Sequence, residues 1–199
     1  MSNELAFLRH AWSLALLVVA LVGCGAGAEA GRPTPRAALT ARSLYPLGEG
    51  YAWSYEVDTG DEDMHLTISR VIGVSGAVVE VSNGVDDLPI RYELRPRGIF
   101  SLATETWLLR DPIRVGAEWD SARGARARVT SIDRRVVTPA GTFEHCVLVV
   151  ESGGEFPRRI ETTYCPGVGP AEVDVRAVMT MGRARAHARL RGYTVEPAE

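Results

Sequence analysis

The chain has 199 residues, of which 46% are hydrophobic, and this length fits one domain with a sizeable core. Its net charge of −3 argues against a general nucleic-acid-binding protein. All 22 basic residues are arginine. A GC-rich genome explains this bias, and selection for phosphate-binding guanidinium groups is the alternative.

The first 23 residues predict a cleaved signal peptide. Arg9 and His10 lie in its polar start, and residues 14–22 form an apolar segment of about nine residues, the usual size in signal peptides. The apolar run over residues 11–22 is shorter than the roughly 20 residues that cross a hydrocarbon core. A buried N-terminal helix and a short membrane anchor are the alternatives.

The segment Leu21-Val22-Gly23-Cys24 resembles the bacterial lipobox, in which a small residue precedes a lipid-bearing cysteine. Cys24 is therefore the predicted site of lipid attachment, and each buried acyl CH₂ group contributes about 0.8 kcal/mol to membrane binding. Gly25, in place of Asp, favours sorting to the outer membrane of a diderm bacterium. We expect a lipid-anchored protein of the cell envelope that faces the periplasm.

Residues 24–43 predict a flexible tether, because they are rich in Gly, Ala and Pro and show no apolar periodicity. A tether of this length has an r.m.s. reach of about 25 Å, which lifts a domain off the headgroups. The remaining residues, 44–199, are expected to form one domain.

Apolar and polar residues alternate with a period of two through almost all of residues 44–199. Turns rich in Gly, Pro, Asn and Asp separate about eleven strand segments. These segments cover residues 51–57, 64–69, 77–82, 90–94, 99–103, 107–109, 126–132, 135–138, a hairpin over 143–165, 172–180 and 183–195. The pattern predicts an all-β fold, a single antiparallel domain built as a strongly curved sheet, a half-barrel or a sandwich.

Two cysteines remain once Cys24 is lipidated, and they lie in a compartment where disulfides persist. Cys146 and Cys165 belong to the predicted hairpin, whose turn at residues 154–157 places them directly opposite each other. Such residues have Cα atoms about 4.5–5.5 Å apart, within disulfide range. We expect a structural disulfide. Two buried thiols and a redox pair are the alternatives, and no CxxC motif supports the redox pair.

One motif occurs twice, 66 positions apart, as Pro46-Leu47-x-x-Gly50-x-x-Trp53 and Pro112-Ile113-x-x-Gly116-x-x-Trp119. In each copy Pro and Gly favour a turn, after which Trp enters a strand with its ring in the core. Two similar turns and an ancient duplication explain the motif equally well.

Three motifs resemble a group of poorly characterised bacterial lipoproteins with β-rich mature domains. In chain order they are Tyr45-Pro-Leu-x-x-Gly-x-x-Trp53-x-Tyr55, Pro139-Ala-Gly-Thr-Phe-x-x-Cys146 and Tyr164-Cys-Pro-Gly-Val-Gly169. The resemblance implies a fold and an envelope location, and it implies no known reaction. A looser analogy, in architecture and location only, is to the curved-sheet carriers that move lipoproteins across the periplasm.

Motifs for catalysis and metal binding are absent from the sequence, which has no GxSxG, HExxH, P-loop or GxGxxG. His10, His65, His145 and His187 are far apart, and His145 points to the opposite strand face from Cys146. The acidic run over residues 58–63 matches no Ca²⁺ motif. We expect a protein that is not an enzyme and uses no metal or cofactor.

The last predicted strand has a basic face. Small apolar residues alternate there with Arg183, Arg185, His187, Arg189 and Arg191, and on an earlier strand with Arg126 and Arg128. If these strands share a sheet face, the arginines form a patch for lipid phosphates or an acidic partner. The alternative is an ordinary solvent face with arginines paired to acids such as Glu172 and Asp174.

Two functional hypotheses follow. The leading one is an envelope lipoprotein that binds a lipid or an apolar peptide segment on the concave side of its sheet. The aromatic residues that would line this site, or fill the core, are Tyr51, Trp53, Tyr55, Trp107 and Trp119. The alternative is a ligand-free interaction module that docks an envelope assembly partner through the Arg-rich face. An open apolar cavity supports the first hypothesis, and a filled core with an exposed patch supports the second.

Overall fold

The computed structural model describes residues 38–60, 63–84, 88–155, 157–179 and 182–195. The predicted signal peptide, Cys24 and most of the predicted tether lie outside these residues. Within the described part of the chain, no helix is long and apolar enough to cross a membrane.

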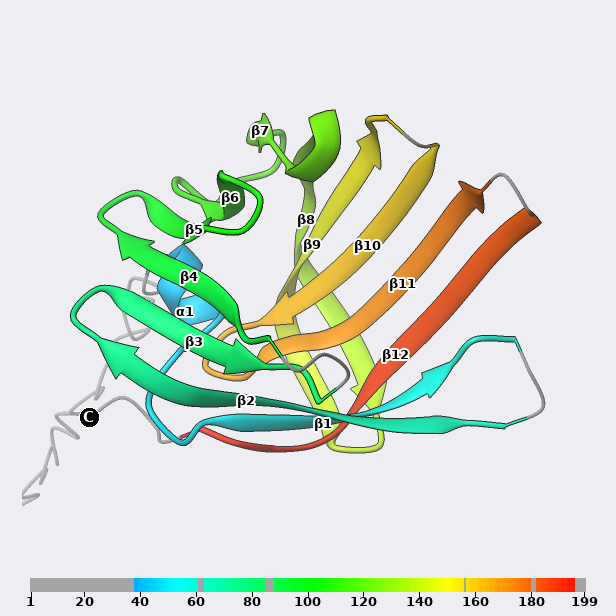
Figure 1. The fold of residues 1–199 in the computed structure, drawn as a ribbon, viewed down its shortest axis with the longest axis horizontal. Coiled ribbons are helices and arrows are strands. Elements are labelled where there is room, and N and C mark those ends of the chain that lie inside the picture. The colour runs from blue at the N-terminus through cyan, green and yellow to red at the C-terminus, as the bar shows by residue number, and fades with distance from the viewer. Residues whose placement is uncertain (1–37, 61–62, 85–87, 156, 180–181, 196–199) are drawn as a thin grey trace, which may run out of the picture. The chain divides into compact units, whose positions relative to one another are not determined.

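One antiparallel sheet forms the described domain, which confirms the predicted all-β fold (Figure 1). Its strands are β1 (Ala52–Asp58), β2 (His65–Ser75), β3 (Val78–Ser82), β4 (Ile90–Arg95), β5 (Gly98–Ser101), β6 (Thr106–Arg110), β7 (Glu118–Asp120), β8 (Ala125–Thr138), β9 (Gly141–Gly153), β10 (Arg158–Cys165), β11 (Gly169–Met179) and β12 (Gly182–Thr194). Their order in the sheet is β6-β5-β4-β3-β2-β1-β12-β11-β10-β9-β8-β7. Two meanders of six strands each, β1–β6 and β7–β12, are therefore joined by the pairing of β1 with β12.

Two strand assignments differ from the prediction of about eleven strands. The three-residue strand β7 is missing from the predicted segments because so short a segment shows no alternation, although the repeated motif predicted that Trp119 enters a strand. The predicted segments 126–132 and 135–138 form the single strand β8. Its register with β9 shifts three times between Val129 and Val136. The buried positions of β8 are odd-numbered up to Val129 and even-numbered from Val136, and the sequence of β8 therefore reads as two separate strands.

The end of the predicted tether is folded. Helix α1 (Ala41–Leu44) starts after Thr40, whose side chain accepts a hydrogen bond from the Ser43 backbone N–H (3.1 Å). Ala41 and Leu44 are completely buried in the core. The backbone N–H of Ala41 also donates to Asp111 Oδ1 (2.9 Å). The folded unit therefore begins before residue 44, the predicted boundary, because a four-residue helix has no periodic signal in the sequence.

Aromatic side chains fill the inner face of the sheet. The Trp53 side chain is fully buried, and its indole N–H donates to the Val168 carbonyl (2.6 Å). The ring of Tyr45 packs against Trp53 (5.2 Å between centroids) and Tyr164 (6.3 Å). The hydroxyl of Tyr55 donates to the Pro170 carbonyl (3.0 Å). These contacts join the start of the first meander to the β10–β11 turn of the second.

The repeated motif forms the same turn at the start of each meander. In the first copy the Tyr51 N–H donates to the Gly48 carbonyl (3.1 Å), and in the second the Ala117 N–H donates to the Arg114 carbonyl (3.0 Å). The motif glycines, Gly50 and Gly116, have φ values of 79° and 83°. The tryptophan that follows is buried in both copies. A shared turn that opens two meanders with equal numbers of strands favours duplication over coincidence.

A side chain links the two edges of the sheet. The edge strands β6 and β7 share no backbone ladder in the sheet order. The indole N–H of Trp119 on β7 donates to the Trp107 carbonyl on β6 (3.0 Å). Trp119 therefore holds the curled sheet together where its strands stop pairing.

The predicted disulfide between Cys146 and Cys165 is confirmed. The two Cα atoms lie 4.3 Å apart, and the register of β9 with β10 places Val147 opposite Tyr164, one position further along the same ladder. The bridge closes a loop with a sequence separation of 19 residues. It fixes the β10–β11 turn beside the aromatic core.

Replacing both cysteines with alanine should lower the free energy of unfolding by about 3 kcal/mol, because loop closure then no longer restricts the unfolded chain. Urea unfolding of the two proteins, followed by tryptophan fluorescence, measures the difference. An equal stability of wild type and C146A/C165A would contradict the structural role. A variant that unfolds far earlier would show that the bridge also fixes the native packing.

Gly169 lies where the β10–β11 turn meets the core, with φ at 112°. A Cβ atom there would lie 2.8 Å from Trp53 Nε1, whereas one on Gly141, with φ at 139°, would meet no atom within 4 Å. Backbone strain costs both alanine variants about 1–3 kcal/mol. Overpacking should cost Gly169→Ala a further 1–3 kcal/mol, roughly. Thermal unfolding of G169A and its matched control G141A tests this, and equal midpoints would contradict it.

Candidate functional site

The register of the strands sorts the side chains of the second meander into an inner and an outer face. On the inner face, Glu151 of β9 lies opposite Ile160 of β10, which lies opposite Val175 of β11. On the outer face, Ser152, Arg159 and Arg176 occupy the adjacent row. Each face has one candidate site.

The inner site is a cleft of about 320 Å³ between the two meanders. Strands β4–β6 form one wall, and helix η1 (Ala122–Gly124) with β9 and β10 forms the other. The larger apolar side chains that line it are Ile90, Tyr92, Trp107, Leu108 and Ile160. A concave, mostly apolar surface of this size is typical of a small-molecule site.

Two charged side chains lie on the second wall of the inner cleft. The Glu151 carboxylate accepts a hydrogen bond from the Ser121 hydroxyl. The Arg158 Nη2 donates to the Ala122 carbonyl (2.5 Å), while its Nε is buried and has no hydrogen-bond partner among the described residues. A buried donor of this kind costs free energy unless it meets an acceptor. Arg158, a lining residue of the cleft, therefore has one N–H group that no described residue accepts.

Three tyrosines on the inner face of the sheet hold their protons strongly. Burial, followed by the negative charge of Glu151, raises the pKa of Tyr92 from 10.0 to about 12. Burial is also the main cause that raises the pKa of Tyr164 well above its usual value, again with a contribution from Glu151. Burial likewise raises the pKa of Tyr55. At neutral pH these tyrosines are hydrogen-bond donors rather than bases.

The five predicted aromatic residues divide between the core and the cleft. Trp53, Tyr55 and Trp119 are buried in the core, and Tyr51 packs against it half-buried. Trp107, which is also half-buried, lines the inner cleft. Most of the aromatic residues that were predicted to line a ligand site or fill the core therefore fill the core.

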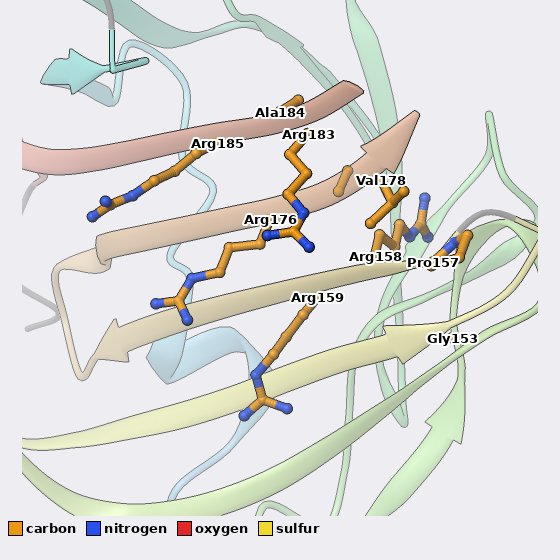
Figure 2. Close-up of a pocket in the computed structure, with 10 residues that line it drawn as sticks. Gly153, Pro157, Arg158, Arg159, Arg176, Val178, Arg183, Ala184 and Arg185 are labelled. Atoms are coloured by element: carbon orange, nitrogen blue, oxygen red, sulfur yellow. The ribbon is translucent and has the colours of Figure 1, made fainter. Parts of the chain in front are cut away.

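The outer site is a depression of about 640 Å³ beside the ends of β10, β11 and β12 (Figure 2). Arg159, Arg176 and Arg185 are direct cross-strand partners in one row. Figure 2 shows these three side chains and that of Arg183 on the same side of the sheet. The predicted basic face of β12 is therefore present, and β10 and β11 extend it.

The remaining predicted arginines of this face are ion-paired or lie apart. Arg126 and Arg128 both pair with Glu118 of β7 (3.4 and 3.5 Å). Arg189 pairs with Glu56 of the neighbouring β1. These three arginines thus match the alternative expectation, an ordinary solvent face on which arginines pair with acids. The exposed Arg191 lies beyond the depression, where the pairing of β12 with β1 is irregular.

Two histidines in the described part of the chain each contact one acidic side chain. His187 contacts Glu172 (3.0 Å), and the exposed His145 contacts Asp133 (2.5 Å). The neighbour of His145, Cys146, is held in the disulfide. Among the residues that the structure describes, no three His, Cys, Asp or Glu side chains gather closely enough to hold a metal.

Sequence analysis missed Glu151 and Arg158, although both leave a signal. Glu151 follows Val147 and Val149 at the inward positions of β9, so a carboxylate interrupts an apolar series. Arg158 occupies the corresponding inward position of β10, two residues before Ile160. Alternation within the hairpin was visible in the sequence. The opposing wall from β4–β6 was not, because it depends on how the sheet curls.

The fold defines the class of protein as a single-domain, strongly curved antiparallel sheet with an inner cleft and an outer basic face. No family model and no curated protein matches the chain. Two solved structures resemble it. One, from Bacteroides fragilis, is assigned as an exported protein with a YmcC-like fold; it is 13% identical, with a TM-score of 0.50, and the match covers 75% of this chain and 98% of that one. The other, from Parabacteroides distasonis, is assigned as a lipoprotein; it is 13% identical, with a TM-score of 0.45 and coverage of 76% and 98%. The first likeness shows a shared fold and does not indicate an activity.

The raised pKa of Tyr92 predicts how stability depends on alkaline pH. Unfolded tyrosine loses its proton near pH 10.0, whereas folded Tyr92 keeps its proton up to about 12. The unfolded state therefore releases protons first, and this stabilising contribution, complete below pH 10, should be lost as the pH rises through 12. Denaturant unfolding at a series of pH values above 9 measures the loss. Tyr92→Phe should make it smaller, and an identical pH profile for this variant would contradict the assignment.

Proposed function

We propose that this protein is an envelope lipoprotein whose β domain binds a lipid or another apolar ligand in the inner cleft. The single observation that carries the proposal is the cleft itself, which combines apolar walls from both meanders with the unpartnered Nε–H of Arg158. An apolar body would pack against Trp107 and Ile160, and an oxygen at its polar end would accept a hydrogen bond from Arg158.

The envelope location rests on the N-terminal sequence. The lipobox-like segment ending at Cys24 and the apolar run before it favour export, lipid attachment and retention on the outer membrane facing the periplasm. The shared fold of the Bacteroides fragilis protein, which is assigned as exported, agrees with this location. On this proposal the protein is a binding protein rather than an enzyme.

The small side chains of the second meander also support a ligand on the inner face. Ala177 of β11 lies opposite Ala184 of β12, and Val175 lies opposite Ala186. These inner-face residues are only partly buried. Small residues on a concave sheet surface leave room beside the cleft for an extended chain such as an acyl tail.

Native mass spectrometry of the full chain, purified from bacterial membranes in a neutral detergent, tests the proposal. The full chain is needed because α1, close to the tether, belongs to the core. We expect an added mass that extraction identifies as a lipid or fatty acid. The variant Ala122→Trp, which fills the cleft at η1, should lose this mass. The matched control Thr142→Trp, at an exposed site on β9, should keep it.

Two outcomes would contradict the inner cleft as the site. One is a chain that carries only its own covalent acyl groups in all three proteins. The other is an added mass that persists in A122W at the wild-type level, since the ligand would then lie elsewhere. Melting temperatures of the variants establish that each remains folded.

A further inference from the structure

The outer depression is lined by charged side chains from three neighbouring strands (Figure 2). Arg159 of β10, Arg176 of β11 and Arg185 of β12 stand directly beside one another in the register. Like charges at directly opposed positions destabilise a sheet. Repulsion between the three guanidinium groups in one row therefore destabilises the folded sheet. Packing of the core does not require arginine at these positions.

Acidic neighbours relieve only part of this charge. Arg159 pairs with Glu161 (2.7 Å) and Arg176 with Asp174 (2.8 Å), each on its own strand. Arg183 and Arg185 make no ion pair or hydrogen bond with any other residue in the described ranges. The depression thus has two uncompensated guanidinium groups, next to two that already have a carboxylate.

The floor of the depression is apolar. Val178 of β11, which is 50% exposed, lies opposite Arg183. Pro157 lies beside it, since the Val178 N–H donates to the Pro157 carbonyl (2.9 Å). An exposed apolar floor under a cationic rim matches a ligand with an anionic head and an apolar body.

We propose that the outer depression binds the phosphate group of an amphiphile, with Arg183 and Arg185 as its main ligands. A guanidinium group donates two parallel N–H bonds, and a phosphate has enough oxygens to accept from two such groups at once. Arg176 would provide the next positive charge in the row, and Val178 would contact the carbon atoms next to the phosphate. Arg183 and Arg185 lie on the opposite sheet face from Glu151 and Ile160 of the inner cleft, although Arg158 lines both sites. The proposal for the depression does not rest on the function proposed for the cleft.

Isothermal titration calorimetry of the full lipidated chain in a neutral detergent tests this site. The probes are n-butyl phosphate, inorganic phosphate and n-butanol, all soluble in water. We expect n-butyl phosphate to bind several-fold more tightly than inorganic phosphate, because its carbon chain covers Val178. n-Butanol should show no binding. Equal affinities for the two phosphates would overturn the amphiphile as ligand and assign the site to free phosphate.

Two double variants with the same change of charge separate a specific site from general electrostatic attraction. Arg183→Gln with Arg185→Gln should weaken n-butyl phosphate binding about tenfold or more, since charge-assisted hydrogen bonds are lost. Arg126→Gln with Arg128→Gln removes two ion-paired arginines of the same sheet face and should change affinity less than about twofold. Equal losses in the two double variants would overturn the proposal.

A separate variant tests the contribution of the apolar floor. Val178→Ser should abolish the preference for n-butyl phosphate over inorganic phosphate and leave the affinity for inorganic phosphate unchanged. Failure of both phosphates to bind the wild-type chain overturns the proposal and leaves the basic row to an acidic protein partner.

Discussion

The burial of Trp53 is the constraint on which the arrangement of the two meanders depends. A buried indole N–H needs an acceptor, and the Val168 carbonyl in the β10–β11 turn supplies it. Strand β1 must therefore lie directly under that turn. The same position places β1 beside β12, with which it pairs. The disulfide at Cys165 holds the turn from the other side. Tyr45 then covers both Trp53 and Tyr164 and brings α1 into the core.

Sequence reasoning predicted what depends on neighbours in the chain. Alternation identified most strands, and the turn at residues 154–157 was enough to pair Cys146 with Cys165. It failed where the pattern is too short or is broken, as at β7 and at the shifted register of β8. Long-range order was also out of reach. The row of Arg159, Arg176 and Arg185 exists only because β10, β11 and β12 are neighbours in this register. No local sequence pattern predicts that register.

The same limit explains the outcome for the candidate sites. The basic face was predicted from β12 alone, and the structure divides its arginines by their partners. Arg189 has Glu56 on the neighbouring strand, whereas Arg183 lies opposite Val178. An ion pair between strands requires the acid to occupy the facing position or a diagonal one, so the distinction follows from register and not from composition. The inner cleft was anticipated as a concave surface, but its polar residues were identified only after the two walls were known.

The unequal lengths of the two meanders explain where the candidate sites lie. If the shared turns at Gly50 and Gly116 reflect duplication, β3, β5 and β6 correspond to β9, β11 and β12. The first three strands have 5, 4 and 5 residues, and their counterparts have 13, 11 and 13. Figure 1 shows the long strands as a tall panel beside the shorter first meander. A core needs only the length that both meanders share. The additional length of the second meander bears Glu151 and Arg158 on one face and the unpaired arginines on the other, where neither group is needed to bury Trp53 or Trp119.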